Sequence, residues 1–197
     1  MSVAAILMAS GFSRRFGEQN KLLFPLRGKP LARHTLELTA VDLADSFLGG
    51  IFFVTACDKV GELAKDLSNV KIIKNNSPEK GTRESVRLGI EAALEADYYF
   101  IFPCDQPFLD VDTVRRMLEA RCPGCIVEAC YKDLNGNLVS QSPSLFCASF
   151  KDELVSVKEG EKPSIVKVRH SKRVIRVEAD ESVLQDIDEK RTLETIK

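Results

Sequence analysis

The sequence predicts an α/β fold with a mostly parallel sheet flanked by helices. Four short apolar runs, each of strand length, recur through the first half of the chain, and segments with helical spacing alternate with them. That alternation is typical of parallel strands joined by crossover helices. The four runs are Val3 to Met8, Ile51 to Val54, Val70 to Ile73 and Tyr98 to Phe102.

Two apolar stripes between these runs predict helices that pack on the sheet. One consists of Leu31, His34, Leu38 and Val41, and the other of Val86, Ile90, Ala93 and Leu94. We expect His34, on the first stripe, to be a hydrogen-bonded and partly buried side chain rather than a ligand.

The last third of the chain changes in style and predicts an antiparallel C-terminal extension of the same sheet. After the short apolar pair Ile126-Val127, residues Asp133 to Asn137 have the composition of a hairpin turn, and Arg173 to Val177 alternate like an edge strand. No low-complexity linker or internal repeat is present. We therefore expect one domain over residues 1–197, with a division near residue 125 into halves 1–125 and 126–197.

Composition narrows the class of partner and the compartment. Lys and Arg (28) nearly balance Asp and Glu (29), so no global field draws the protein to nucleic acid or to an anionic membrane. The apolar runs are too short to span a bilayer and no leader pattern is seen, which predicts a cytoplasmic protein.

The six cysteines are irregularly spaced, which favours reduced thiols over a disulfide framework. Cys122-Pro-Gly-Cys125 matches a redox pattern, but Pro-Gly between a helical segment and a strand is better interpreted as a turn. A zinc site needs four ligands. Cys130 could be a third ligand beside Cys122 and Cys125, but no nearby histidine completes the set.

The loop after the first apolar run concentrates cations beside flexible backbone. It contains Gly11 and Gly17 together with Arg14, Arg15 and Lys21. The spacing fits neither the dinucleotide fingerprint G-x-G-x-x-G nor the P-loop G-x-x-x-x-G-K-[ST]. Such a loop suits a triphosphate, bound by backbone and by side-chain cations. The alternative is a solvated basic loop.

Asp105 follows the fourth apolar run and is expected at the carboxyl end of that strand, on the same rim as the cationic loop. Magnesium needs only one or two protein carboxylates when phosphates supply further oxygens. Asp110 and Asp112 are expected to cap the following helix, whose apolar stripe is Val114, Met117 and Leu118. Asp186 and Asp188 are both candidates for a second metal ligand or for caps of a terminal helix.

The stretch LMASGFSRRFGEQNKLLFPLRGKPL resembles the opening signature of the molybdopterin nucleotidyltransferases, which have a Rossmann-like, glycosyltransferase-A-type fold. GTRESVRLGI, FPCDQPFLD and DIDEKRTLE resemble later family segments in the same order. The matched positions of the opening signature are Leu7, Gly11, Ser13, Arg15, Gly17, Asn20, Lys21, Leu22, Gly28 and Pro30.

The resemblance implies transfer of a nucleotide from a nucleoside triphosphate to the phosphate of molybdopterin, with release of pyrophosphate. It implies catalytic roles for Lys21, Arg15 and Asp105, and a Mg²⁺ (or Mn²⁺) site at Asp105 with Asp188 favoured over Asp186. It also implies nucleotide contacts from Ala9, Ser10, Gly11, Ser13, Arg15, Lys21, Gly81 and Ser85.

The Asp-Gln-Pro segment is similar to the cytidylyltransferase (MocA-like) branch and favours CTP, whereas Ser10 matches neither the CTP nor the GTP pattern. The half 1–125 is then the nucleotide-binding half and 126–197 the acceptor-binding half. A molybdenum hydroxylase is the partner that this branch implies. GTP, a sugar or alcohol phosphate acceptor, and a non-catalytic chaperone that delivers cofactor are the alternatives.

The segment GEKPSIVKVRH departs from the family pattern in the region that faces the pterin. Lys162, Lys167, Arg169 and His170 could contact an anionic acceptor, or they could form a solvated face of mixed charge.

Overall fold

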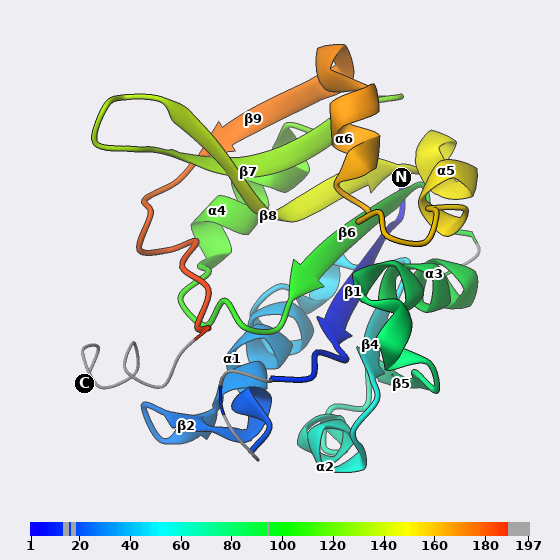
Figure 1. Cartoon of the computed structure of the whole chain (residues 1–197), viewed down its shortest axis with the longest axis vertical. Coiled ribbons are helices and arrows are strands. Elements are labelled where there is room, and N and C mark those ends of the chain that lie inside the picture. The colour runs from blue at the N-terminus through cyan, green and yellow to red at the C-terminus, as the bar shows by residue number, and fades with distance from the viewer. Residues whose placement is uncertain (14–15, 17–18, 94, 189–197) are drawn as a thin grey trace.

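The computed structural model describes residues 1–13, 16, 19–93 and 95–188. Its centre is a seven-stranded sheet in the order β5-β4-β1-β6-β8-β7-β9 (Figure 1). The strands are β1 (Val3–Ala9), β4 (Ile51–Thr55), β5 (Val70–Lys74), β6 (Tyr98–Pro103), β7 (Ile126–Lys132), β8 (Leu138–Cys147) and β9 (Val174–Glu178). A separate two-stranded hairpin is formed by β2 (Pro25–Leu26) and β3 (Lys29–Pro30).

The predicted α/β class is confirmed, with one refinement of the extension. Strands β1, β4, β5 and β6 are parallel, and β8 is antiparallel to both of its neighbours, β6 and β7. The edge strand β9 is parallel to β7. In the described part of the chain, β8 is therefore the one strand of this sheet that runs against the others.

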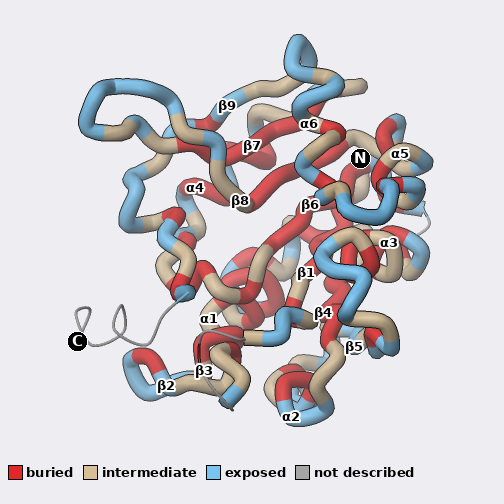
Figure 2. The backbone as a smooth tube through the Cα atoms, viewed as in Figure 1, coloured by how far each residue is buried: buried red, intermediate tan, exposed pale blue. Residues whose placement is uncertain are grey.

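Helices cover both faces of the sheet. They are α1 (Leu31–Glu37), α2 (Asp58–Gly61), α3 (Thr82–Ala92), α4 (Val111–Glu119), α5 (Lys151–Val155) and α6 (Ile165–Arg169). The side chains of β1 alternate between two buried clusters, one shared with α1 and α4 and the other with α3, α5 and α6. Figure 2 shows the resulting buried band along β1, β4 and β6.

The helical stripes were predicted correctly except at Val41. Leu31, Val86, Ile90 and Ala93 are buried, and Leu94 lies outside the described residues. Val41 is 58% exposed. The reason is a π-helical turn at Leu38–Asp42, which follows α1 and changes the rotation per residue that the stripe assumed.

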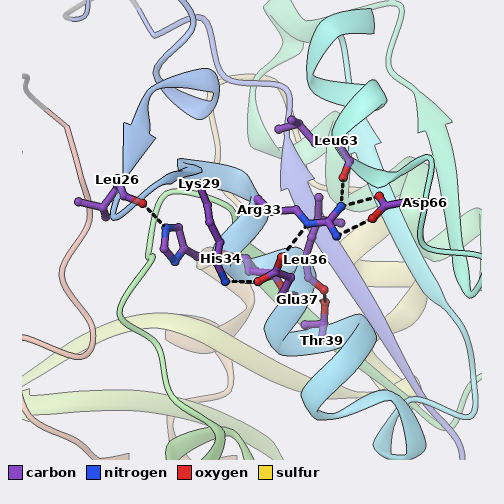
Figure 3. A network of polar contacts seen from close by, with 10 residues as sticks. Leu26, Lys29, Arg33, His34, Leu36, Glu37, Thr39, Leu63 and Asp66 are labelled. Carbon is purple, nitrogen blue, oxygen red and sulfur yellow. Dashed lines mark hydrogen bonds and ion pairs between the residues drawn. The ribbon is translucent and has the colours of Figure 1, made fainter.

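Helix α1 is fixed to its neighbours by a network of polar contacts (Figure 3). The Arg33 guanidinium donates to both carboxylate oxygens of Asp66 (2.6 and 2.7 Å) and to the Leu63 carbonyl (2.7 Å). Glu37 accepts from Arg33 (3.0 Å) and from Lys29. His34 Nε2 lies 3.0 Å from the Leu26 carbonyl, which confirms the expected hydrogen-bonded histidine. These contacts link α1 to the β2–β3 hairpin and to the segment after α2.

Two other local predictions are confirmed. Asp110 caps α4 by accepting from the Thr113 N–H (2.8 Å). Cys122 to Cys125 form a turn in which the Cys125 N–H donates to the Cys122 carbonyl (3.1 Å), with Gly124 at a φ of +70°.

Helix α3 packs on β1 through a glycine. A Cβ placed on Gly89 would overlap the side chain of Ile6, so only glycine allows this approach of helix to strand. Gly89 therefore lets the carboxyl half of α3 lie close to β1.

Gly89→Ala should destabilise the protein by about 1–2 kcal/mol, because the overlap with Ile6 outweighs the higher helix propensity of alanine. Urea unfolding measures the change. Gly61→Ala is the matched control, since its Cβ would meet Ile72 and Thr55 at an ordinary 3.7 Å. Equal effects of the two substitutions would contradict the packing account.

Arg33→Met should lower Tm at pH 7 by roughly 2–6 °C, because it removes the donor of the Leu63 carbonyl and of the Asp66 carboxylate and leaves Glu37 with Lys29 alone. The hydrogen bond from Lys29, with a smaller contribution from Arg33, holds the pKa of Glu37 below its usual range, and the hydrogen bonds from Arg33 do the same for Asp66. The stabilisation is therefore present above the unfolded-state pKa values and is lost as pH falls through the lower folded values, below about pH 4. Lys65→Met, at an exposed i,i+3 pair with Glu62, should change Tm little at any pH.

Candidate functional site

The candidate site lies where the parallel strands β1 and β6 end. The loop after β1 and the amino end of α3 enclose a cleft of about 380 Å³. Ser10, Gly11 and Ser13 line it from the loop, and Gly81 and Ser85 line it from the opposite side. Open parallel sheets bind ligands at this edge.

A short turn presents Lys21 to this cleft. The side-chain oxygen of Asn20 accepts from the Leu22 N–H (3.0 Å) and caps the helical turn Lys21–Leu23. Ser13 Oγ donates to the same oxygen (3.3 Å) and accepts from the Lys21 N–H (3.0 Å). Ser13 itself has a φ of +50°, so the loop bends sharply here. The backbone of Lys21 is thus fixed on both sides.

The Lys21 ammonium binds two aspartates from distant parts of the chain. Its Nζ lies 2.6 Å from Asp105 Oδ2 and 3.0 Å from Asp188 Oδ1. The Lys21 side chain is only 12% exposed. Burial disfavours the charged ammonium, but the two carboxylates outweigh burial and raise the pKa of Lys21 above its usual value. Lys21 is therefore a fixed cation.

Gln106 holds the segments that carry the two aspartates together. It is 1% exposed, and its Nε2 donates to the carbonyls of Leu184 (2.8 Å) and Ser142 (3.1 Å). Beside it, the Ile187 N–H donates to the Asp105 carbonyl (2.9 Å). These bonds place Asp188 next to Asp105.

Asp186 differs from the other two aspartates. Burial, together with the charges of Asp105 and Asp188, raises its pKa to about 6. Within the described residues, the Lys21 ammonium forms ion pairs with Asp105 and Asp188. The structure therefore brings Asp188, of the two candidates, onto the same cation as Asp105. The expected terminal helix cap falls largely on residues 189–197, outside the described residues.

The other predicted nucleotide contacts divide into three groups. Ser10, Gly11, Ser13, Gly81 and Ser85 line the cleft. Ala9 is buried at the end of β1, does not line the cleft, and accepts from Thr55 Oγ1 through its carbonyl (3.1 Å). Arg15 and Gly17 lie outside the described residues.

A second cleft, of about 350 Å³, lies on the other side of Asp105. The two clefts adjoin at the aspartate, since both are lined by Met8, Thr82, Pro103 and Asp105. The far wall of the second cleft includes Ser142, Ser144, Lys162 and Lys167.

Two residues of the predicted acceptor segment point elsewhere. Arg169 pairs with Glu153 and Glu161, and His170 Nε2 lies 2.7 Å from Glu153. Neither lines the second cleft. For these two, the structure supports the solvated face of mixed charge. Lys162 and Lys167 do face the cleft.

The donor set fits a hard divalent cation that is shared with phosphates. No cluster of three or more His, Cys, Asp or Glu side chains able to hold a metal occurs among the described residues. Asp105 and Asp188 offer carboxylate oxygens around one point, and magnesium often uses only one or two carboxylates when a substrate supplies phosphate oxygens.

Three residues at the site were missed from the sequence. Gln106 was noted only as part of a motif, and its buried amide had no separate signal. Thr82 and Ser142 are brought to the clefts by the start of α3 and by an irregularity in the pairing of β7 with β8. A hydroxyl near a predicted helix start was the only signal for Thr82.

In the described residues, no helix is long and apolar enough to cross a bilayer.

Comparison with known proteins identifies related sequences over most of the chain. The sequence profile of the MobA-like NTP transferase domain matches residues 5–175. Nicotine blue oxidoreductase from Paenarthrobacter nicotinovorans is 27% identical over 195 residues, which cover 94% of this chain and 92% of the relative. Molybdenum cofactor guanylyltransferase from Cupriavidus metallidurans is 26% identical over 184 residues, 91% of this chain and 86% of the relative.

A third relative covers less. 2-C-methyl-D-erythritol 4-phosphate cytidylyltransferase from Dehalococcoides mccartyi strain CBDB1 is 29% identical over 133 residues, which cover 66% of this chain and 59% of the relative.

Solved structures confirm the fold. Rv0371c from Mycobacterium tuberculosis H37Rv superposes with a TM-score of 0.77 at 22% identity, covering 98% of this chain and 99% of that one. The same protein in complex with manganese gives a TM-score of 0.73 at 21% identity, covering 100% and 98%.

Gln106→Leu should loosen the segment that carries Asp188, because the Leu184 and Ser142 carbonyls lose their buried donor. We expect a loss of about 1–3 kcal/mol in stability. Hydrogen exchange should rise at the Ile187 amide. Gln185→Leu, at an exposed neighbouring position, is the matched control and should leave both unchanged. An unaltered Ile187 amide in Gln106→Leu would refute the linking role.

Proposed function

The chain belongs to the MobA-like NTP transferase family, and we propose that it transfers CMP from CTP to the phosphate of molybdopterin, releasing pyrophosphate. The observation that carries the proposal is the meeting of Lys21, Asp105 and Asp188 at the junction of two clefts. One cleft would hold the nucleotide and the other the acceptor. Residues 1–125 then supply most of the nucleotide half and residues 126–197 most of the acceptor half.

The reaction needs positioning and charge neutralisation more than proton transfer. A phosphate monoester is largely dianionic near neutral pH, since its second pKa is about 6, so its oxygen can attack without a general base. The attacking oxygen forms a bond to the α-phosphorus as the bond from that phosphorus to the bridging oxygen breaks, and pyrophosphate leaves with the bonding electrons. The main obstacle is the approach of two anions.

Lys21 is suited to neutralise the charge that gathers on the α-phosphate. Its turn is held by Asn20 and Ser13, and its ammonium is fixed and kept charged, so little reorganisation is required during the reaction. Arg15, in the same loop, is proposed to bind the β- and γ-phosphates.

Asp105 and Asp188 are the residues that would hold Mg²⁺ or Mn²⁺. Such a cation supplies charge neutralisation between the nucleotide phosphates and the attacking phosphate. The chain's own contribution is to keep both carboxylates in place through Gln106 and the Ile187–Asp105 hydrogen bond.

The nucleoside is proposed to lie against Ser10, Gly11, Gly81 and Ser85, with the backbone of Ala9 behind them. Gly81 has a φ of +76° and precedes α3, and Gly81, Thr82 and Ser85 line the cleft, so the start of this eleven-residue helix borders it. A helix amino terminus favours negative charge.

CTP is the proposed nucleotide substrate because the segment Asp105-Gln106-Pro107 resembles the cytidylyltransferase (MocA-like) pattern. One relative is named as a cytidylyltransferase and another as a guanylyltransferase, so both nucleotides belong in the assay. A molybdenum hydroxylase is the proposed recipient of the product.

The test is pyrophosphate release by the purified protein with CTP or GTP, Mg²⁺ and molybdopterin. We expect preferential use of CTP and no release after chelation of the metal. Pyrophosphate release with GTP alone would overturn the choice of CTP. Release only with a sugar or alcohol phosphate would overturn the acceptor. Nucleotide binding without release from any acceptor would favour a delivery chaperone.

Lys21→Ala should lower kcat by roughly 10²–10³-fold while the protein stays folded, because the fixed cation is removed. Circular dichroism and Tm verify folding. Lys80→Ala, at a lysine just before Gly81 that does not line the cleft, is the control. Near-normal turnover of Lys21→Ala would exclude the proposed role.

A further inference from the structure

We propose that the second cleft selects acceptors bearing an anionic group remote from the reacting phosphate, and that Lys167, positioned by Glu128, determines this specificity. The inference rests on the proposed nucleotidyl transfer and concerns the acceptor half of the same site. It assigns a role to a buried charge cluster that the transfer step itself does not use.

The cluster centres on the buried carboxylate of Glu128, whose side chain is 3% exposed. It accepts from Ser140 Oγ (2.7 Å) and pairs with Arg176 Nε (3.1 Å) and Lys167 Nζ (2.9 Å). One carboxylate thus faces two cations, and one positive charge is left over. Arg176 alone would suffice to balance Glu128.

The surplus charge is presented to the second cleft. Lys167 is 15% exposed and lines the cleft, and its Nζ also lies 3.2 Å from Ser144 Oγ. Glu128 and Ser144 face each other across the β7–β8 pair, so two strands fix the position of the ammonium. Lys162 adds a second cation to the same wall.

The cationic wall lies away from the reacting end. Ser144 pairs with Ile101, four positions before Asp105, and strands rise about 3.3 Å per residue, so the two ends are separated by up to about 13 Å along the chain direction. Asp105 and Asp186 make the other end acidic. A metal-bound phosphate suits the Asp105 end, and a separate anionic group suits Lys167 and Lys162. The opposite charges at the two ends would orient the acceptor.

The experiment compares acceptor binding by the wild-type protein, Lys167→Met and Lys167→Arg, measured without CTP by equilibrium dialysis. The probes are molybdopterin, which carries sulfur anions apart from its phosphate, and phenyl phosphate, whose distal end is uncharged. We expect Lys167→Met to weaken molybdopterin binding at least about tenfold, and Lys167→Arg to retain most of it. Phenyl phosphate binding should not change.

Kinetics give a second measure that separates this inference from the proposed function. In Lys167→Met, KM for molybdopterin should rise by a similar factor while KM for CTP stays within about twofold. Lys172→Met, at an exposed lysine outside the cleft, is the control. If the wild type releases no pyrophosphate, the proposed function fails and the binding comparison still tests Lys167.

The double variant Lys167→Met/Glu128→Gln addresses a loss of folding, because it removes the carboxylate together with its partner. Tm is measured for each protein. Weak molybdopterin binding in a stable double variant supports the specificity role. Binding restored to the wild-type level in the double variant, or unchanged in Lys167→Met, would overturn it.

Discussion

The contact on which the site depends is the one ammonium shared by Asp105 and Asp188. Two carboxylates that bind the same ammonium repel each other, and the positive charge of Lys21 makes their approach favourable. The three residues are far apart in the sequence, so the site exists only when the sheet has formed. The parallel arrangement of β1 and β6 brings Lys21 and Asp105 together. The Gln106 hydrogen bonds bring Asp188 to them. Figure 1 shows the corresponding convergence of the loop after β6 with the C-terminal segment.

The two clefts are formed by different parts of the fold. The first cleft is built on the parallel strands and the start of α3, a helix that packs on the sheet through the close approach of Gly89 to Ile6. The second cleft is built on the reversed strand β8 and on α6, which are linked by the charge cluster around Glu128. Asp105 belongs to both sides. A ligand in either cleft therefore meets the same carboxylate.

Much of the fold and part of the site could be predicted from the sequence, since strand-length apolar runs and helical stripes report directly on burial. The predicted burial of Val41 was wrong because a π-helical turn cannot be recognised from spacing. The proximity of Lys21 to Asp105 followed from strand order, but the choice of Asp188 over Asp186 depended on which carboxylate the backbone turns towards Lys21. Gln106 and Glu128 act through buried contacts across the sheet, and no local pattern reports on such contacts. Arg169 and His170 were open alternatives because charge alone does not reveal which face of α6 is covered.

The reversal of β8 produces a β-ribbon that extends beyond the parallel part of the sheet. The hairpin turn at residues 133–137 and the first residues of β8 lie beyond the last pairing with β6, which ends at Ile101. Leu134, at the tip, is fully exposed. Lengthening or shortening this ribbon would leave the register of β1, β4 and β6 unchanged. The architecture thus allows related proteins to vary the length of this ribbon while keeping the same parallel core.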